Sequence, residues 1–324
     1  MQPPRRDVTR VRGSSSGANA ATISVCHRSA IGREGNGAQT VPAVGAGWGS
    51  RAFRCDGATN VGRVPHRLTP RPRNPVYALY QRSIRRSLER EAMPRHVAMI
   101  LDGNRRWARQ LGLETAAHGH RAGAAKIREF LVWCDELGIE VVTLYLLSTD
   151  NLAARESGEL QALIEIIADL AEELAGYRNW RVKHVGSDVG LPAPLLGALQ
   201  AAEQRTRDHP GLHVNLAVGY GGRKEIADAV HSIIADHQRT GGGLEELAAV
   251  LTPELIGEHL YTGGQPDPDL VIRTSGEQRL SDFMLWQSAH SEFYFVEALG
   301  PDLREVDFLR ALRSYVQRHR RFGS

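Results

Sequence analysis

The chain has 324 residues, of which 42% are hydrophobic and 24% are charged, proportions that are ordinary for a soluble globular protein. Its net charge of +3 is uneven: residues 1–73 hold twelve arginines, no lysine and three acidic residues, and the remainder holds 28 basic and 34 acidic residues. The larger part is therefore mildly acidic, which excludes general nucleic-acid binding through charge alone.

The three cysteines and the hydropathy of the chain bear on its compartment. Cys26, Cys55 and Cys134 form no disulfide framework, so we expect a reducing, cytoplasmic environment. No apolar run approaches the roughly 20 residues of a membrane-spanning helix, and the N-terminus lacks the apolar region of a signal peptide. Any membrane contact is therefore expected to be peripheral.

Residues 1–73 differ in composition from the rest. They are rich in Gly, Ser, Arg and Pro, show neither helical nor strand periodicity, and end in the proline-rich stretch 68–75. We interpret them as a disordered extension before a catalytic domain of residues 74–324. A basic RNA-binding tail is the functional alternative, and an extension without a role is the plainer one.

From residue 76 onward, a helical pattern at 76–91 precedes short apolar runs that alternate with helical stretches such as 122–138 and 158–177. Nearly continuous apolar strands between helices are typical of a parallel sheet covered on both faces. We therefore predict an α/β fold with a central six-stranded parallel sheet flanked by helices. The predicted strands are 96–101, 140–147, 180–186, 212–219, 269–273 and 291–296.

Polar groups gather where the predicted strands end. The first run ends in Asp102, the second in Ser148, and the fourth and fifth lead into 219–223 and 273–281. Ligands bind beyond the carboxyl ends of parallel strands, so we expect one shared rim. Arginine and serine bind phosphate oxygens, and glycine lets backbone N–H groups approach them. A lone aspartate among arginines favours Mg²⁺ as a mediator, so the rim predicts a magnesium-bound diphosphate.

Each segment has a plainer interpretation when taken alone. Residues 102–104 are typical of a turn, 219–223 of a strand-to-helix loop, and Glu292 of an acid at a strand edge. Nucleotide, zinc and serine-hydrolase sites are disfavoured, because the sequence has no phosphate-binding loop, no GxGxxG after a strand, no zinc-ligand spacing and no nucleophile elbow.

The residues resemble the cis-prenyltransferases, or Z-isoprenyl diphosphate synthases, in ordered blocks from about Pro94 to Gly323. The blocks are HVAMILDGNRRWA, GHRAGA, TLYLLSTDN, VNLAVGYGGRKEI, DLVIRTSGEQRLSDFMLWQSAHSEFYF and RHRRFG. The resemblance implies a homodimer, an apolar tunnel for the growing chain, and Mg²⁺-dependent condensation of isopentenyl diphosphate with an allylic diphosphate. It also implies that the C-terminal RRFG reaches the active site of a partner subunit.

The resemblance further implies roles for individual residues. Asp102 would position Mg²⁺ and diphosphate, Glu292 would be a second metal ligand near the dimer interface, and Asn151 would accept a proton. Arg273, Arg279 and Ser281 would hold isopentenyl diphosphate, and 103–107 with His120 the allylic diphosphate. The implied substrate-binding positions are Gly103, Asn104, Arg105, Arg106, Trp107, His120, Ser148, Thr149, Asp150, Arg155, Arg273, Arg279, Leu280 and Ser281.

Departures from the family pattern concern the loop after the second run and the product. Asp150 stands where Glu is usual, Leu152 where long-chain members have Trp, and Arg155 is displaced by one residue. Leu146 replaces an Ala of long-chain members, which narrows the tunnel. We therefore expect a short product, (2Z,6E)-farnesyl diphosphate made from geranyl diphosphate. The alternatives are a C50–C55 polyprenyl diphosphate and, from another class, a non-catalytic partner subunit.

Overall fold

The structure, a computed structural model, describes residues 75–88, 92–154, 157–241 and 243–322. The predicted extension 1–73 lies outside these residues. Each of the six apolar runs forms a strand, as predicted. The strands are β1 (His96–Ile100), β2 (Val141–Ser148), β3 (Arg181–Val185), β4 (His213–Tyr220), β5 (Leu270–Arg273) and β6 (Glu292–Phe295).

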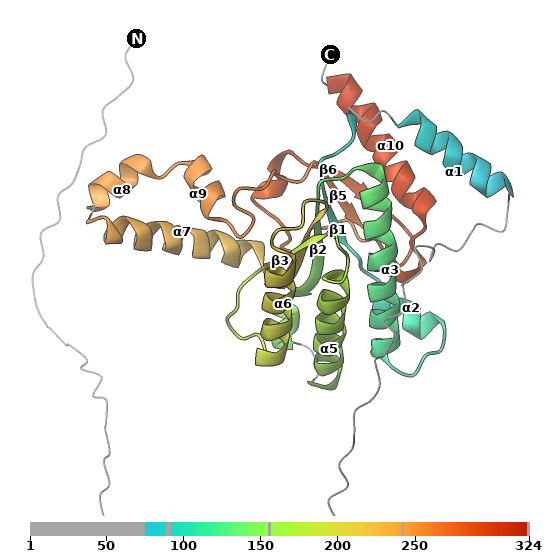
Figure 1. The fold of residues 1–324 in the computed structure, drawn as a ribbon, viewed down its shortest axis with the longest axis horizontal. Coiled ribbons are helices and arrows are strands. Elements are labelled where there is room, and N and C mark those ends of the chain that lie inside the picture. Colours follow the sequence, from blue (N-terminus) through green and yellow to red (C-terminus); the bar gives the residue numbers. More distant parts are fainter. Residues whose placement is uncertain (1–74, 89–91, 155–156, 242, 323–324) are drawn as a thin grey trace, which may run out of the picture. The chain divides into compact units, whose positions relative to one another are not determined.

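All six strands belong to one parallel sheet in the order β3-β4-β2-β1-β5-β6. Figure 1 shows this sheet with helices beside it. Every residue of β1 is buried, and its side chains alternate between the faces: Val97 and Met99 join one apolar cluster, Ala98 and Ile100 another. The apolar runs are continuous because both faces of the sheet are covered, which confirms the predicted class.

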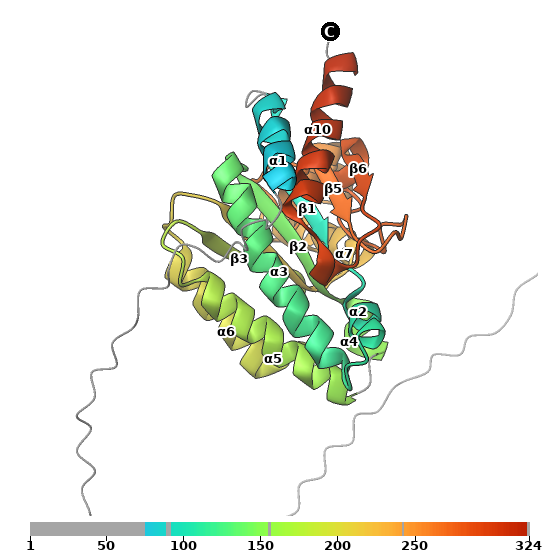
Figure 2. The same cartoon turned by 90° about the vertical axis from the view of Figure 1, so that its right-hand side faces the viewer.

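Helices cover one face and flank the sheet (Figure 2). α3, α5, α6 and α10 pack with the odd-numbered residues of β1 into the larger apolar cluster, where the Phe130 and Phe308 rings meet edge-on at 4.9 Å. The helices are α1 (Pro75–Ser87), α2 (Asn104–Gln110), α3 (Ala116–Leu137), α4 (Thr149–Ala154), α5 (Ser157–Leu174), α6 (Ala193–Thr206), α7 (Gly222–Arg239), α8 (Leu244–Val250), α9 (Pro253–His259) and α10 (Glu305–Phe322), with short 3-10 turns η2 (Gln287–His290) and η3 (Gly300–Asp302).

Local sequence explains where these helices end. α3 begins six residues before the predicted 122, directly after the extended Thr115, and it ends at Gly138, whose φ of 77° suits a left-handed cap. α9 begins after Thr252, whose hydroxyl accepts a hydrogen bond from the Leu255 amide at 3.2 Å. Among the described residues, no helix has the length and apolar composition needed to cross a membrane.

The opposite face of the sheet is covered by the segment 280–290 and the start of α7. Phe283 and Met284 are fully buried there against Tyr220 at the end of β4. β1 and β5 are neighbours in the sheet, but the chain leaves β1 toward α3 on one face and leaves β5 toward 280–290 on the other. Their carboxyl ends therefore form the switch point where an open sheet binds its ligand.

Candidate active site

Asp102 follows β1 at this switch point, as predicted. Its Oδ2 accepts a hydrogen bond from Nη2 of Arg273 at 2.6 Å, and its Oδ1 accepts one from the Gly103 amide at 2.6 Å. Burial raises the pKa of Asp102, but the two hydrogen bonds and the charges of Arg273 and Arg106 outweigh it, so that the pKa lies below its usual value. The group is therefore a carboxylate at neutral pH.

Arg273 ends β5 and connects Asp102 to the loop beyond that strand. Its side chain is only 4% exposed. Its Nη1 donates to Oγ of Ser281 at 2.9 Å and to the carbonyl oxygen of Arg279 at 2.5 Å. One guanidinium thus holds Asp102 on one side and fixes the position of Ser281 on the other.

Glu277 lies between the two predicted diphosphate subsites. Its carboxylate accepts hydrogen bonds from Arg106, at 3.3 Å, and from Arg279. Arg106 also donates to the carbonyl oxygen of Ser275 at 3.3 Å. Sequence reasoning did not select Glu277, although it stands between two chosen residues, because a carboxylate by itself repels phosphate.

Thr274 joins the loops that follow β1 and β5. Its hydroxyl accepts a hydrogen bond from the Asp102 amide at 2.8 Å and donates to the Asp102 carbonyl oxygen at 2.8 Å. Thr274 is fully buried. In the sequence, Thr274 is noticeable only as the residue after Arg273. Sequence reasoning therefore also missed that it connects the two loops.

Close packing against α3 fixes the first turn of α2. A Cβ on Gly119 would lie 2.0 Å from the carbonyl oxygen of Asn104, and a Cβ on Gly123 would lie 2.7 Å from its Oδ1. The two glycines of GHRAG therefore let α3 approach the start of α2. This contact sets the position of the arginines that follow Asn104.

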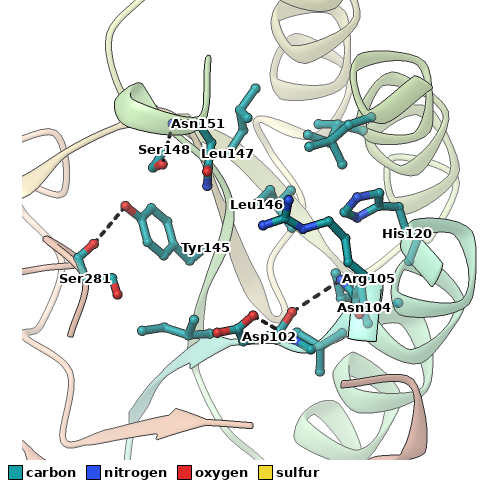
Figure 3. Close-up of a pocket in the computed structure, with 18 of the residues that line it drawn as sticks. Asp102, Asn104, Arg105, His120, Tyr145, Leu146, Leu147, Ser148, Asn151 and Ser281 are labelled. Atoms are coloured by element: carbon teal, nitrogen blue, oxygen red, sulfur yellow. Dashed lines mark hydrogen bonds between the residues drawn. The ribbon is translucent and has the colours of Figure 1, made fainter. Parts of the chain in front are cut away.

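His120 and Arg105 converge on one carboxylate, that of Glu159 at the start of α5. Glu159 Oε1 lies 3.1 Å from Nε2 of His120 and 3.8 Å from Nε of Arg105. His120 is 7% exposed and reaches the cavity from α3 (Figure 3). Glu159 is another residue that sequence reasoning did not select.

The end of β2 contains a β-bulge. Tyr145 pairs with Ala217 and Leu147 with Val218, so Leu146 is an extra residue. An alternating strand turns consecutive side chains to opposite faces, whereas here every residue from Tyr145 to Ser148 lines one cavity (Figure 3).

Tyr145 and Ser148 place hydrogen-bonding groups at this end of β2. Burial raises the pKa of Tyr145 to about 12, so its hydroxyl stays protonated and donates to the Ser281 carbonyl oxygen at 3.1 Å. Ser148 Oγ accepts from the Asn151 amide at 3.0 Å, which fixes the turn into α4.

The cavity that these residues surround has a volume of about 570 Å³. Charged and polar groups from the loops after β1, β2 and β5 form one part of its wall. Apolar side chains of α3, α5 and β2 form the rest, namely Ala124, Ile127, Leu146, Leu147, Leu163, Ile166, Ile167 and Leu170. The site can therefore bind an anionic head beside an apolar chain.

Most of the predicted site residues lie on this cavity. Those that line it are Asp102, Gly103, Asn104, Arg105, Arg106, His120, Ser148, Asp150, Asn151, Arg273, Arg279 and Ser281. Arg155 and Gly323 lie outside the described residues.

Three predicted substrate-binding residues do not line the cavity. Trp107 points from α2 toward η3, and its indole N–H donates to Oδ1 of Asp302 at 2.9 Å. Leu280 packs on the apolar cluster around Phe283. Thr149 faces Gly221, where an added Cβ would meet its Oγ1 at 2.8 Å. Each of these side chains contacts the scaffold that supports the site.

The segment 219–223 was also expected on the rim, and that expectation needs correction. None of its residues lines the cavity in the described structure. Instead, the Gly222 amide donates to the Asp282 carbonyl oxygen at 2.7 Å, and the Arg223 amide to Asp282 Oδ1 at 3.2 Å. The segment therefore supports the loop after β5 through Asp282, outside the cavity.

Within one chain, Glu292 does not lie with Asp102. Glu292 begins β6 in register with Leu270, the first residue of β5, whereas Arg273 beside Asp102 is the last. Glu292 therefore lies at the amino ends of the strands, and Asp102 lies at their carboxyl ends. Glu292 accepts a hydrogen bond from Arg318 at 2.7 Å.

The donor atoms fit a magnesium ion that shares its coordination with phosphate. Asp102 supplies hard carboxylate oxygens, and its side chain is 39% exposed. No group of three or more His, Cys, Asp or Glu in the described residues could hold a metal alone. Mg²⁺ is commonly held by one or two carboxylates together with substrate phosphates, so Asp102 suits this mode.

Comparison with known proteins is consistent with this geometry. The family described as "Putative undecaprenyl diphosphate synthase" matches residues 100–323. The (2Z,6E)-farnesyl diphosphate synthase of Thermobifida fusca is 57% identical over 251 residues, 78% of this chain and 98% of that protein. The protein of that name from Mycobacterium tuberculosis is 53% identical over 263 residues, 79% of this chain and 98% of the other.

A solved structure shares the fold. It is the crystal structure of lavandulyl diphosphate synthase from Lavandula x intermedia in complex with dimethylallyl diphosphate, with a TM-score of 0.66 and 36% identity. The alignment covers 72% of this chain and 100% of that one.

Proposed function

This chain belongs to the undecaprenyl diphosphate synthase family of prenyltransferases, and from that premise we propose that it condenses isopentenyl diphosphate with geranyl diphosphate to (2Z,6E)-farnesyl diphosphate. It is a Z-isoprenyl diphosphate synthase, a transferase that forms a cis double bond. The names of its relatives support the short product.

The observation that carries the proposal is the division of the cavity into two parts. The carboxylate of Asp102 and the guanidinium of Arg273 meet where β1 and β5 end, and the apolar part continues past Ile127, Leu163 and Leu170. A prenyl diphosphate has the same division: its head would lie among the arginines and its chain among the leucines and isoleucines.

Asp102 would hold Mg²⁺ together with the diphosphate oxygens of the substrate. The ion would supply positive charge to the diphosphate as it leaves the allylic carbon. We propose that Arg105 and Arg106 bind that leaving diphosphate, and that Arg273, Arg279 and Ser281 bind the diphosphate of isopentenyl diphosphate. Positive groups fixed before the reaction stabilise the developing negative charge without having to reorganise.

The condensation product must lose a proton, and we propose that Asn151 takes part in this step. Asn151 lines the cavity beside Ser148 and Asp150. An amide is a weak base, so Asn151 would orient a diphosphate oxygen or a water molecule that accepts the proton.

The size of the whole cavity, head-group part included, supports a short chain. A cavity of about 570 Å³ falls within the roughly 300–1,000 Å³ of sites for small organic ligands. The bulge in β2 adds Leu146 to the wall. The C50–C55 product is the alternative.

We also propose that the enzyme acts as a homodimer, in which Glu292 of one chain and the C-terminal RRFG would serve an interface or the other subunit's site. The placement of Glu292 away from Asp102 within one chain supports a role for it only in such an assembly. A non-catalytic partner role is disfavoured, because the ion pair of Asp102 and Arg273 and the arginines beside it are all present.

Product analysis tests the proposal. The purified chain would be incubated with Mg²⁺, radiolabelled isopentenyl diphosphate and dimethylallyl, geranyl or (E,E)-farnesyl diphosphate, and the dephosphorylated products resolved by chromatography. We expect geranyl diphosphate to be the best primer and C15 the main product. A main product of C50 or longer contradicts the short chain, and absence of condensation with every primer contradicts the enzyme.

A further inference from the structure

The loop after β5 contains an unusual run of backbone conformations. Ser281, Asp282 and Met284 have positive φ angles of 51°, 63° and 47°. Residues other than glycine adopt this region unfavourably, so such conformations persist only where the surroundings fix them. Ser281 lies in the cavity wall, so whatever fixes this run also fixes part of the site.

Tyr220, the last residue of β4, holds the run by its hydroxyl. The Met284 amide donates to the Tyr220 hydroxyl oxygen at 3.1 Å, and the hydroxyl donates to Oε2 of Glu225 at 2.5 Å. Tyr220 is fully buried, and its ring meets that of Phe283 edge-on at 5.8 Å. The backbone at Met284 is therefore connected to Glu225 through one buried hydroxyl.

Glu225 is the centre of this network and is 1% exposed. Besides Tyr220, its carboxylate accepts hydrogen bonds from Nε2 of Gln287 at 3.0 and 3.1 Å and from the Tyr261 amide at 3.0 Å. Burial raises the pKa of Glu225, although these hydrogen bonds oppose the rise. Two of the three groups that donate to Glu225 hold this part of the loop: Gln287 belongs to it, and the Tyr220 hydroxyl accepts from the Met284 amide. The buried carboxylate therefore keeps 284–287 in one geometry.

The network is separate from the groups assigned to chemistry. In the described structure, neither Tyr220, Glu225 nor Gln287 lines the cavity. Their effect must therefore pass through the loop, whose earlier part carries Arg279 and Ser281. Arg273 binds both of these residues, so a displaced loop also loses these contacts.

We propose that Glu225 is a positioning residue that acts through the Tyr220 hydroxyl to hold Ser281 and Arg279 in place for the diphosphate of isopentenyl diphosphate. This inference rests on the proposed function for the identity of the substrate. The allylic subsite belongs to the start of α2, which α3 supports instead, so the effect falls mainly on isopentenyl diphosphate.

Tyr220→Phe tests the proposal, because it keeps the aromatic packing and deletes only the hydroxyl. We expect KM for isopentenyl diphosphate to rise about tenfold, the scale of losing a buried hydrogen-bond partner, with KM for the allylic diphosphate and kcat within about threefold. Thr206→Val is the control: Thr206 is fully buried in α6, and its hydroxyl accepts from the Val182 amide at 2.9 Å. It should lower thermal stability and leave both KM values unchanged.

Glu225→Gln is the conservative variant. Its amide oxygen can still accept from the Tyr220 hydroxyl, so its KM for isopentenyl diphosphate should lie between those of the native enzyme and Tyr220→Phe. Equal changes in both KM values, or the same change in Thr206→Val, would indicate loss of stability alone and overturn the proposal.

Hydrogen exchange separates this inference from the proposed function. Tyr220→Phe should speed exchange of the Met284 amide and its neighbours, whereas Thr206→Val should not. Unchanged exchange of the Met284 amide overturns the positioning role, regardless of which substrates the enzyme converts. Faster exchange in a chain that condenses no substrate would support the loop network and reject the proposed function.

Discussion

The two diphosphate loops are held in place by different physical means. The loop after β1 leads directly into α2, and its backbone is fixed by contact with two glycines of α3, Gly119 and Gly123. The loop after β5 is irregular and contains left-handed residues. It is fixed by hydrogen bonds that Tyr145 and the start of α7 donate to it and by one that Tyr220 accepts from it. Close packing against α3 dominates at the start of α2, where Thr274 adds hydrogen bonds to the Asp102 backbone, whereas hydrogen bonds to buried polar groups dominate in the loop after β5.

This difference predicts opposite sensitivities. A loop held by close packing is displaced when an atom is added, because the neighbouring backbone has no space to receive it. A loop held by hydrogen bonds is displaced when an atom is removed, because a buried partner is then left unsatisfied. The following substitutions test that contrast, and the first acts on the residue that both loops share.

Asp102→Ala should have the largest effect, because Asp102 binds the Gly103 amide in one loop and Arg273 in the other. We expect turnover to fall by about 10³-fold or more, the scale of losing a metal ligand and a preorganised charge. Circular dichroism should show an intact fold. Chelation of Mg²⁺ with EDTA should abolish native turnover, and undiminished activity in EDTA or in the variant would exclude the proposed metal role.

Gly119→Ala should act on the first loop alone. The added methyl group would lie 2.0 Å from the Asn104 carbonyl oxygen, so α2 must move. We expect the free energy of unfolding to fall by about 1–3 kcal/mol and KM for the allylic diphosphate to rise more than KM for isopentenyl diphosphate. Gly197→Ala is the matched control, because nothing lies within 4 Å of a Cβ there. Equal behaviour of the two variants would refute the packing argument.

Leu146→Ala should change the product with little effect on either loop. Leu146 lies in the bulge of β2 and lines the cavity, so its loss lengthens the space for the prenyl chain. We expect products longer than C15, detected by chromatography, with both KM values nearly unchanged. Leu199→Ala, at a buried leucine of α6, should lower stability and leave the product at C15. An unchanged product in Leu146→Ala would remove this residue as the determinant.

Deletion of residues 1–73 should have the smallest effect. The segment lacks apolar periodicity, and from this we expect it to add no packed core to the protein. A chain that begins at residue 74 should match the full chain in thermal midpoint and in both KM values. A large loss in either measurement would show that the segment supports one of the loops.

The sequence was sufficient to predict the strands and the rim. The six apolar runs are long enough to identify buried parallel strands, and the ends of such strands meet at one edge, which places Asp102 and Arg273 on the same rim. Their direct contact follows from the pairing of β1 with β5, which the sequence did not predict. The direction in which side chains point could not be predicted. Trp107 follows Arg106 directly, yet helical rotation turns it to Asp302 and away from the cavity.

Features that depend on pairing between distant strands were also beyond the sequence. The bulge at Leu146 arises from the register of β2 against β4, and neither strand's composition records that register. The segment 219–223 resembled a phosphate-binding loop in the sequence, because glycines let backbone N–H groups come close to a phosphate or to any other acceptor. Here that acceptor is the backbone of Asp282 rather than a ligand.

Glu277 gives the site a built-in counter-ion. Its carboxylate is shared by Arg106 and Arg279, one from each loop, so part of their charge is neutralised before any substrate arrives. A diphosphate must compete with this carboxylate for the same guanidinium groups. Salt ions in solution screen these arginines less, because Glu277 already neutralises part of their charge. Substrate affinity should consequently depend less steeply on ionic strength than the number of arginines at the rim suggests.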